Sequence, residues 1–290
     1  MSCTSRETIL HDPVSSSEVE MRVQSMLERG VPYGDVPKRF LGDPRHDTRY
    51  EKKYAELNAA AFGLGAAGFT SLDFDPIESP DFVVRQNNVI LSYLEVVRII
   101  EDDQAEYDGL LAQVNVALRQ RADADRKFAE HIHGFFCEIV LPEPPLKRIR
   151  KALVAEVVDL LATMPPGEER PRLADVPARY PMLRSVNAKY IVLTGRDASH
   201  VAFREPAKTF DDLSIANLAL ERLAAKRRIA ARYSGSPLWI LMYCEEPGIQ
   251  GALHILADVE IGIRPFSRVF IGGQRRVLEL RDTPRPGGRR

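Results

Sequence analysis

The sequence predicts an α/β protein in which a mixed central β-sheet is flanked by helices. Two observations support this fold class. Segments typical of helices and of strands alternate along the chain, in the order helix, hairpin, helices, strand, helix, strands, helix and strand. In addition, 44% of the 290 residues are hydrophobic, which allows a sizeable core in one large domain or two small ones.

The first two predicted elements are helices. Serines within residues 15–29 can cap a helix over that range, whereas residues 1–14 are expected to be irregular. A second helix is expected over residues 49–62. The three glycines within residues 63–68 are interpreted as its stop signal. They spell G-x-G-x-x-G, but a dinucleotide-binding site has this motif after a strand rather than after a helix.

The strongest strand pattern lies in residues 80–98. Residues 82–84 are apolar, residues 86–88 have the turn-forming sequence Gln-Asn-Asn, and residues 89–100 are rich in Val, Ile, Leu and Tyr. Two β-prone runs around such a turn predict a β-hairpin.

Helices and strands continue along the rest of the chain. The expected helices cover residues 101–119, 122–133, 146–164 and 211–233, and the expected strands cover residues 135–141, 190–193, 201–203, 238–243 and 259–263. We therefore expect an N-terminal helix and loop over residues 1–45 and an α/β domain over 46–263. A helical insertion is expected around 103–188, and a C-terminal tail over 264–290.

Composition excludes several classes of protein. The 40 basic and 41 acidic residues nearly cancel, so binding to a polyanion would need a local basic face. The cysteines, Cys3, Cys137 and Cys244, are odd in number and lack C-x-x-C spacing, which argues against a disulfide framework and a cysteine zinc site. No signal peptide and no apolar run long enough for a membrane helix is evident. We expect a cytoplasmic protein without membrane contact.

The predicted hairpin contains two carboxylates that could take part in binding or catalysis, Asp81 and Glu95. Glu95 stands among Leu, Val and Ile, and a buried carboxylate is costly unless it is paired or binds a cation. Asp81 begins the partner strand, so the hairpin can bring both groups together. Two converging carboxylates suit a hard cation such as Mg²⁺. The alternative is that Asp81 is a turn residue and Glu95 lies on a solvated face.

The hairpin resembles the motif of the PD-(D/E)XK nuclease superfamily, which is Pro-Asp, a hairpin, and then Glu-x-Lys on the second strand. The matching segments are Pro80–Val84 and Leu94–Arg98. Members of this superfamily often have a further acidic residue on an upstream helix. Glu56 is the best match for that residue here, and Glu51 is the alternative.

A later segment extends the resemblance. Bacterial members often have a helix that carries a lysine and ends near a tyrosine, followed by an apolar strand. The matches are Lys226, Tyr233 and residues 238–243. The resemblance covers about residues 49–110 and 211–263, and it implies a restriction-endonuclease-like arrangement of the mixed sheet and its helices.

The resemblance implies a metal-dependent endonuclease that hydrolyses phosphodiester bonds in DNA. Asp81, Glu95 and Glu56 would hold Mg²⁺ or Mn²⁺, which activates water and polarises the phosphodiester. The motif lysine, however, is replaced by Val97. We expect Lys226 to supply the missing ammonium group. The alternative is a catalytically inactive protein of the same fold that binds nucleic acid or a partner protein.

Several residues near these positions are candidates for contact with nucleic acid. They are Arg98, Arg227, Arg228, Arg232 and Tyr233. The alternative for the cluster at 226–232 is a solvated face near a helix C-terminus, where the helix dipole favours cations. DNA is the expected partner of an active enzyme, and the sequence leaves a homodimer open.

Overall fold

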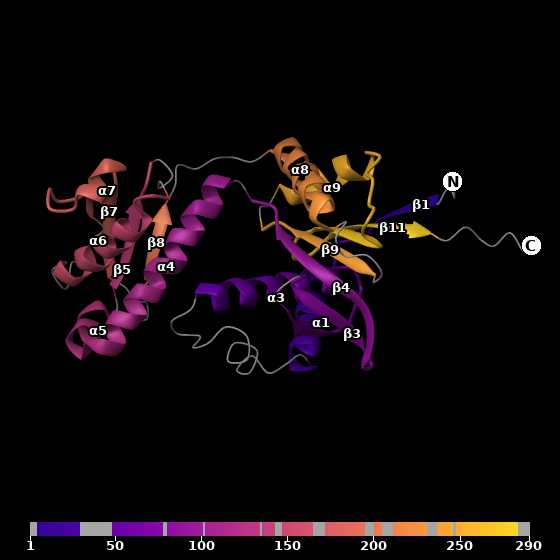
Figure 1. The fold of residues 1–290 in the computed structure, drawn as a ribbon, viewed down its shortest axis with the longest axis horizontal. Helices are drawn as coiled ribbons and strands as arrows, with labels where there is room; N and C mark the ends of the chain where they lie inside the picture. The colour runs from indigo at the N-terminus through magenta and orange to yellow at the C-terminus, as the bar shows by residue number, and fades with distance from the viewer. Residues whose placement is uncertain are drawn as a thin grey trace, which may run out of the picture. The chain divides into compact units, whose positions relative to one another are not determined.

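The computed structural model describes most of the chain. The described residues are 5–29, 48–77, 80–100, 102–133, 135–142, 147–164, 172–194, 200–204, 211–230, 237–245 and 248–283. They form eight helices and two β-sheets, one of seven strands and one of four (Figure 1). The chain forms two compact units, of which unit 1 comprises Met1–Leu41, Lys52–Ile100 and Thr209–Arg290, and unit 2 comprises Gly42–Glu51 and Glu101–Lys208.

Unit 1 contains the mixed sheet that the sequence predicts, so the α/β class is confirmed. In spatial order its strands are β1 (Ser5–Leu10), β11 (Val277–Thr283), β10 (Arg268–Gly272), β9 (Leu238–Tyr243), β4 (Val89–Arg98), β3 (Phe82–Gln86) and β2 (Asp73–Pro76). β9 pairs in parallel with both β4 and β10, and the other neighbours are antiparallel. Helices connect the parallel strands, as parallel pairing requires.

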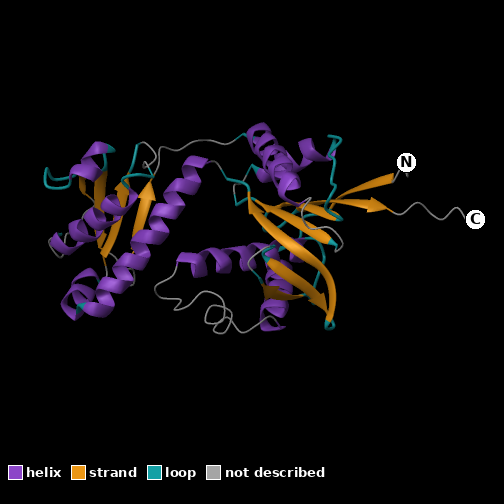
Figure 2. Cartoon of the chain, viewed as in Figure 1, coloured by secondary structure: helices purple, strands orange, loops and turns teal. Residues whose placement is uncertain are grey.

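Helices cover both faces of this sheet (Figure 2). Helices α1 (Ser16–Arg29) and α3 (Thr48–Ala66) lie on one face, and α8 (Asp212–Ala230) and α9 (Ile249–Ala257) lie on the other. Along β9, Trp239 and Leu241 belong to the core under α3, whereas Ile240 and Met242 belong to the core under α8. Burial on both faces explains why β9 is apolar throughout.

The predicted hairpin is confirmed. Strands β3 and β4 pair antiparallel, with Phe82 opposite Leu94. Asn87 and Asn88 form the turn with φ values of 52° and 65°. Asparagine tolerates this left-handed conformation better than most residues, so the Asn-Asn pair fixes the position of the turn.

Helix α3 corrects the interpretation of the glycines. The helix continues through Gly63 and Gly65 to Ala66, and only Gly68, at φ +94°, follows its end. Gly63 serves packing instead, because a Cβ atom there would lie 2.7 Å from Leu241 Cδ1 of β9. The glycine allows the helix to approach the sheet closely.

Replacing Gly63 with alanine is expected to lower the free energy of unfolding by about 1–3 kcal/mol, because the new methyl group overpacks the contact with Leu241. Gly109 provides a control position within a helix, because a Cβ atom there would meet only the end of the Arg150 side chain, with Nη1 at 3.6 Å. Gly109→Ala is expected to raise the stability by about 0.5–1 kcal/mol. Urea denaturation followed by circular dichroism measures both. A Gly63→Ala midpoint at or above that of the wild type would contradict the packing role.

The two ends of the described chain differ from the expected irregular N-terminus and C-terminal tail. β1 and β11 pair along their lengths, from Ser5 opposite Thr283 to Leu10 opposite Leu278, and β10 joins them to β9. These strands are held by partners far away in the sequence, which local patterns do not reveal. Conversely, residues 259–263 form no strand. Residues 284–290 lie outside the described part.

Unit 2 has its own sheet and core. Its four strands are β6 (Arg172–Asp175), β7 (Lys189–Thr194), β5 (Phe135–Val140) and β8 (His200–Arg204), and its helices are α4 (Asp102–Ala124), α5 (Arg126–Ile132), α6 (Arg150–Thr163) and α7 (Pro181–Ser185). The strands expected over 135–141, 190–193 and 201–203 are β5, β7 and β8, so this region is an α/β unit and not the helical insertion that the sequence predicts. Within the described residues, no helix of either unit has the length and apolar character needed to cross a membrane.

Candidate functional site

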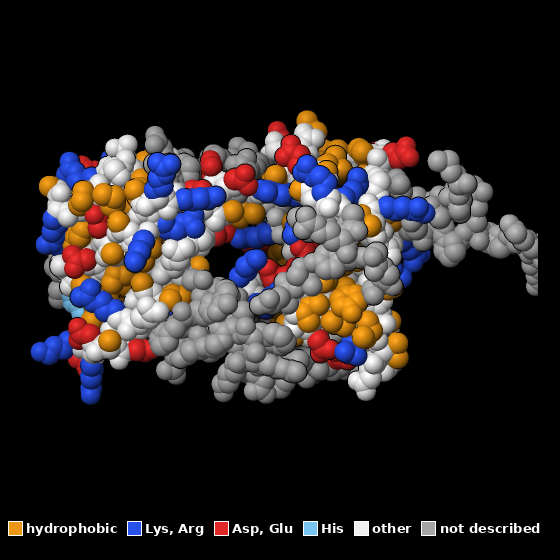
Figure 3. All heavy atoms as spheres, in the orientation of Figure 1, with side chains coloured by type: hydrophobic (Ala, Val, Ile, Leu, Met, Phe, Trp, Pro, Cys, Tyr) orange, Lys and Arg blue, Asp and Glu red, His pale blue; other side chains and the backbone are white. Residues whose placement is uncertain are grey.

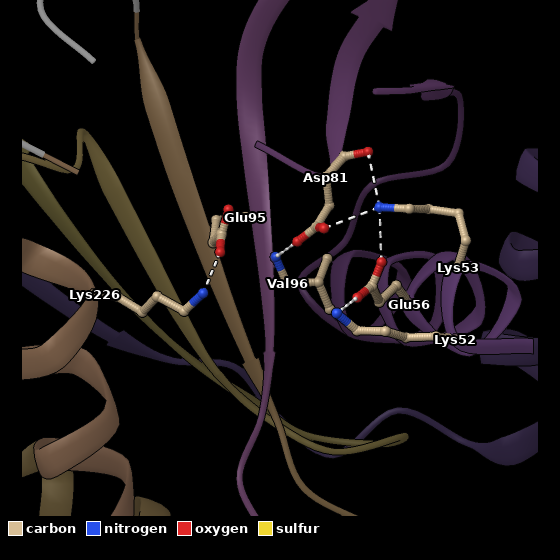
Figure 4. A network of polar contacts seen from close by, with 7 residues as sticks. All are labelled: Lys52, Lys53, Glu56, Asp81, Glu95, Val96 and Lys226. Carbon is tan, nitrogen blue, oxygen red and sulfur yellow. Dashed lines mark hydrogen bonds and ion pairs between the residues drawn. The ribbon is translucent and has the colours of Figure 1, made fainter. Parts of the chain in front are cut away.

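Two carboxylates of the predicted site meet at one ammonium group. Lys53 and Glu56 lie on α3, and Asp81 directly precedes β3. Lys53 Nζ lies 2.8 Å from Glu56 Oε2 and 2.9 Å from Asp81 Oδ1 (Figure 4). The three side chains are only 12–15% exposed. They form a two-carboxylate site with a cation at its centre.

The backbone holds Asp81 in place. Val96 N–H donates to Asp81 Oδ2 at 2.9 Å, so the carboxylate meets β4 just beyond the last backbone pair of the hairpin. The carbonyl of Asp81 accepts from the N–H of Ile77 at 3.0 Å. The backbone carbonyl and the side-chain Oδ2 of Asp81 therefore both accept backbone hydrogen bonds. The remaining carboxylate oxygen, Oδ1, faces Lys53.

The electrostatics of this cluster follow from burial and close charges. Burial raises the pKa of Glu56, and the negative charge of Asp81 raises it further, against the opposing effect of Lys53. Burial alone would lower the pKa of Lys53, but its contacts with Glu56 and Asp81 outweigh burial and raise it. The ammonium of Lys53, together with that of Lys52 at 3.3 Å from Glu56 Oε1, thus offsets the repulsion between the two carboxylates.

Glu95 lies on the other face of β4. Successive residues of a strand point to opposite faces, so Glu95 shares the face of Val97, which belongs to the core under α8. There Glu95 is paired with the ammonium of Lys226 from α8. Figure 4 shows Glu95 and Lys226 on one side of β4, and Asp81, Lys53 and Glu56 on the other.

The structure therefore joins the predicted residues in two groups. Asp81 and Glu56 come together, as do Glu95 and Lys226, but Glu95 does not reach the ammonium that Asp81 and Glu56 share. Lys53 was missed by the sequence analysis. Its signal is the i,i+3 spacing to Glu56 on a helix ahead of the Pro-Asp pair, which places both side chains on one helix face.

The residues predicted to contact nucleic acid differ in their exposure to solvent. Arg98 is exposed and donates to Glu245 at 2.8 Å. Arg228 is exposed near the end of α8, whereas Arg227 is half-buried beside Gly262. Arg232 and Tyr233 lie outside the described residues. On the face drawn in Figure 3, basic side chains are scattered among acidic ones.

The oxygen atoms around Lys53 match the ligands that Mg²⁺ and Mn²⁺ prefer. Two carboxylate oxygens converge on one cation, and the Asp81 carbonyl lies 3.5 Å from the same ammonium. Asp81 and Glu56 thus offer oxygen atoms of the kind that a hard cation takes, whereas Glu95 is not part of this set. Among the described residues, no cluster of three or more His, Cys, Asp or Glu side chains has a metal-binding arrangement.

Comparison with protein-family models, with curated proteins and with solved structures finds no match to this chain.

Proposed function

We propose that the chain is a nuclease-like enzyme that hydrolyses phosphodiester bonds in DNA with the help of Mg²⁺ or Mn²⁺. The observation that carries the proposal is the convergence of Asp81 and Glu56 on one positive charge. Such an arrangement of buried oxygen atoms is suited to a hard cation.

The order of elements adds support. An acidic helix (α3), a Pro-Asp pair, a hairpin (β3 and β4), a lysine-bearing helix (α8) and an apolar strand (β9) follow one another as the PD-(D/E)XK resemblance implies. We therefore propose a restriction-endonuclease-like arrangement for unit 1. Lys226, which contacts Glu95, is the candidate for the lysine that Val97 replaces.

In this proposal Asp81 and Glu56 would hold the cation, which lowers the pKa of water and polarises the phosphodiester. Glu95 orients Lys226 by pairing with it. Lys226 lies on the opposite face of β4 from Asp81 and Glu56, and its proposed role is to supply positive charge to the phosphate without contact with the cation. Arg228 and Arg98 are exposed basic side chains that would contact DNA phosphates, and Arg98 would then exchange its ion pair with Glu245 for the phosphate.

Cleavage of plasmid DNA with Mg²⁺ or Mn²⁺ tests the proposal. Asp81→Asn is expected to reduce the rate by at least about a hundredfold, because it removes the charge that holds the cation. Asp75→Asn is the matched control, since Asp75 lies on β2 of the same sheet and pairs with Arg85 at 2.6 Å. Equal cleavage by both variants, or none by the wild type with either metal, would reject the proposal.

A second candidate is a non-catalytic protein of the same architecture that binds nucleic acid or a partner protein. It is favoured by one observation: each carboxylate of the site already has a lysine partner in the chain. Buried ion pairs can serve structure alone. Filter binding of DNA without cleavage at any metal concentration would favour this candidate over the enzyme.

A further inference from the structure

We infer that Lys53 is a built-in competitor of the divalent cation, whose ammonium occupies the place between Asp81 and Glu56 until the metal displaces it. This inference rests on the metal site of the proposed function and deepens it. It assigns a regulatory role to a residue outside the resemblance, and it concerns metal affinity rather than hydrolysis.

The geometry around Lys53 Nζ supports this role. A lysine ammonium has three donor hydrogens and no acceptor. Three oxygen atoms surround it: Glu56 Oε2 at 2.8 Å, Asp81 Oδ1 at 2.9 Å and the Asp81 carbonyl at 3.5 Å. The lysine thus uses the same oxygen face that a hard cation would use.

The surroundings hold the ammonium in that place. The Lys53 side chain is 15% exposed, and its Nζ lies 5.0 Å from the centre of the Phe82 ring, an arrangement that attracts a cation. Water and salt therefore screen the lysine less than they screen a surface residue.

Metal and ammonium cannot occupy this face together. A divalent cation bound to Asp81 and Glu56 would lie within a few ångströms of Lys53 Nζ, where like charges at low dielectric repel strongly. Binding therefore requires the ammonium to move away and give up its contacts with both carboxylates. The metal affinity of the wild type is lowered by this exchange, and both carboxylates keep a cationic partner when metal is scarce.

The neighbouring lysine provides a matched control. Lys52 is 79% exposed, and its Nζ lies 3.3 Å from Glu56 Oε1, whereas Lys53 Nζ lies 2.8 Å from Glu56 Oε2. Lys52→Met therefore removes the same charge from the same helix, one residue away, without emptying the space between Asp81 and Glu56.

Isothermal titration of the full chain with MnCl₂ and with MgCl₂ at pH 8 tests the inference. Lys53→Met is expected to bind metal at least about tenfold more tightly than the wild type, because a close like charge is removed. Lys52→Met is expected to stay within about threefold, since an exposed charge is screened. Metal binding by Lys53→Met that is equal to or weaker than that of the wild type would overturn the inference.

Melting temperatures with and without MnCl₂ test the inference even if Lys53→Met is less stable than the wild type. Without metal, this variant is expected to melt below the wild type, because two carboxylates face each other unbalanced. Saturating MnCl₂ is expected to raise its melting temperature more than that of the wild type. A smaller rise than in the wild type would count against competition, as would the absence of any metal effect on either protein.

The outcomes separate this inference from the proposed function. Tighter metal binding by Lys53→Met together with no DNA cleavage would keep the competition and reject the nuclease. Metal-dependent cleavage by the wild type together with unchanged metal affinity of Lys53→Met would keep the nuclease and reject the competition.

Discussion

Replacing Lys226 with methionine is expected to reduce the single-turnover rate of DNA cleavage by about 10²–10³-fold, the usual effect of removing one preorganised hydrogen-bond donor. Methionine keeps most of the length and apolar stem of lysine but loses the charge. Lys226 reaches Glu95 from α8, and it is the described lysine that contacts the carboxylate at the start of the Glu-x-Lys pattern. We expect the rate at saturating DNA to fall more than the apparent affinity.

Lys189→Met controls for the loss of a positive charge, because Lys189 lies on β7 in unit 2 and is 51% exposed. Its cleavage rate is expected to equal that of the wild type. Melting temperatures of both variants show whether unit 1 stays folded when Glu95 loses its partner. A folded Lys226→Met variant that cleaves within threefold of the wild type would remove Lys226 from the proposed mechanism.

Replacing Phe270 with alanine is expected to lower the free energy of unfolding of unit 1 by about 3–5 kcal/mol, the range for removing a buried phenyl group. Phe270 lies on β10 and is fully buried. Its ring lies 5.7 Å from that of Trp239 on β9 and 6.1 Å from that of Phe69, edge-on to both. The substitution therefore removes both core volume and two favourable aromatic contacts.

Urea denaturation followed by fluorescence measures this effect, because Trp239 is the one tryptophan in the sequence and lies in unit 1. Val259→Ala serves as the control, since Val259 is 42% exposed. We expect it to change stability by no more than about 0.5 kcal/mol. A Phe270→Ala effect as small as the control would mean that the strands near the C-terminus contribute little to the core.

Local patterns are sufficient for several features of this fold. The Gln-Asn-Asn turn between two β-prone runs predicts the hairpin, because asparagine tolerates the backbone conformation of the turn. The continuous apolar run at 238–243 predicts a strand, which is β9 and is buried along its whole length. Serine caps, helical periodicity and acidic first turns likewise predict α1, α4 and α8 within a few residues of their observed bounds.

Other features depend on contacts between distant segments. β1 and β11 are separated by nearly the whole chain and carry no strong strand pattern of their own, so only their pairing identifies them. Gly63 and Gly65 have the composition of a helix stop, but α3 continues through them. The close approach of Gly63 to Leu241 on β9 decides the role of that glycine.

The candidate site likewise has some features that the sequence predicts and others that only the tertiary structure decides. Its residue types follow from the sequence, because a Pro-Asp pair, a glutamate in an apolar strand and a lysine on a later helix can each be recognised locally. How the charges pair does not follow, because it depends on which face of β4 each side chain occupies and on which helix packs there. Packing places Lys53 of α3 between Asp81 and Glu56, and Lys226 of α8 against Glu95 on the opposite face.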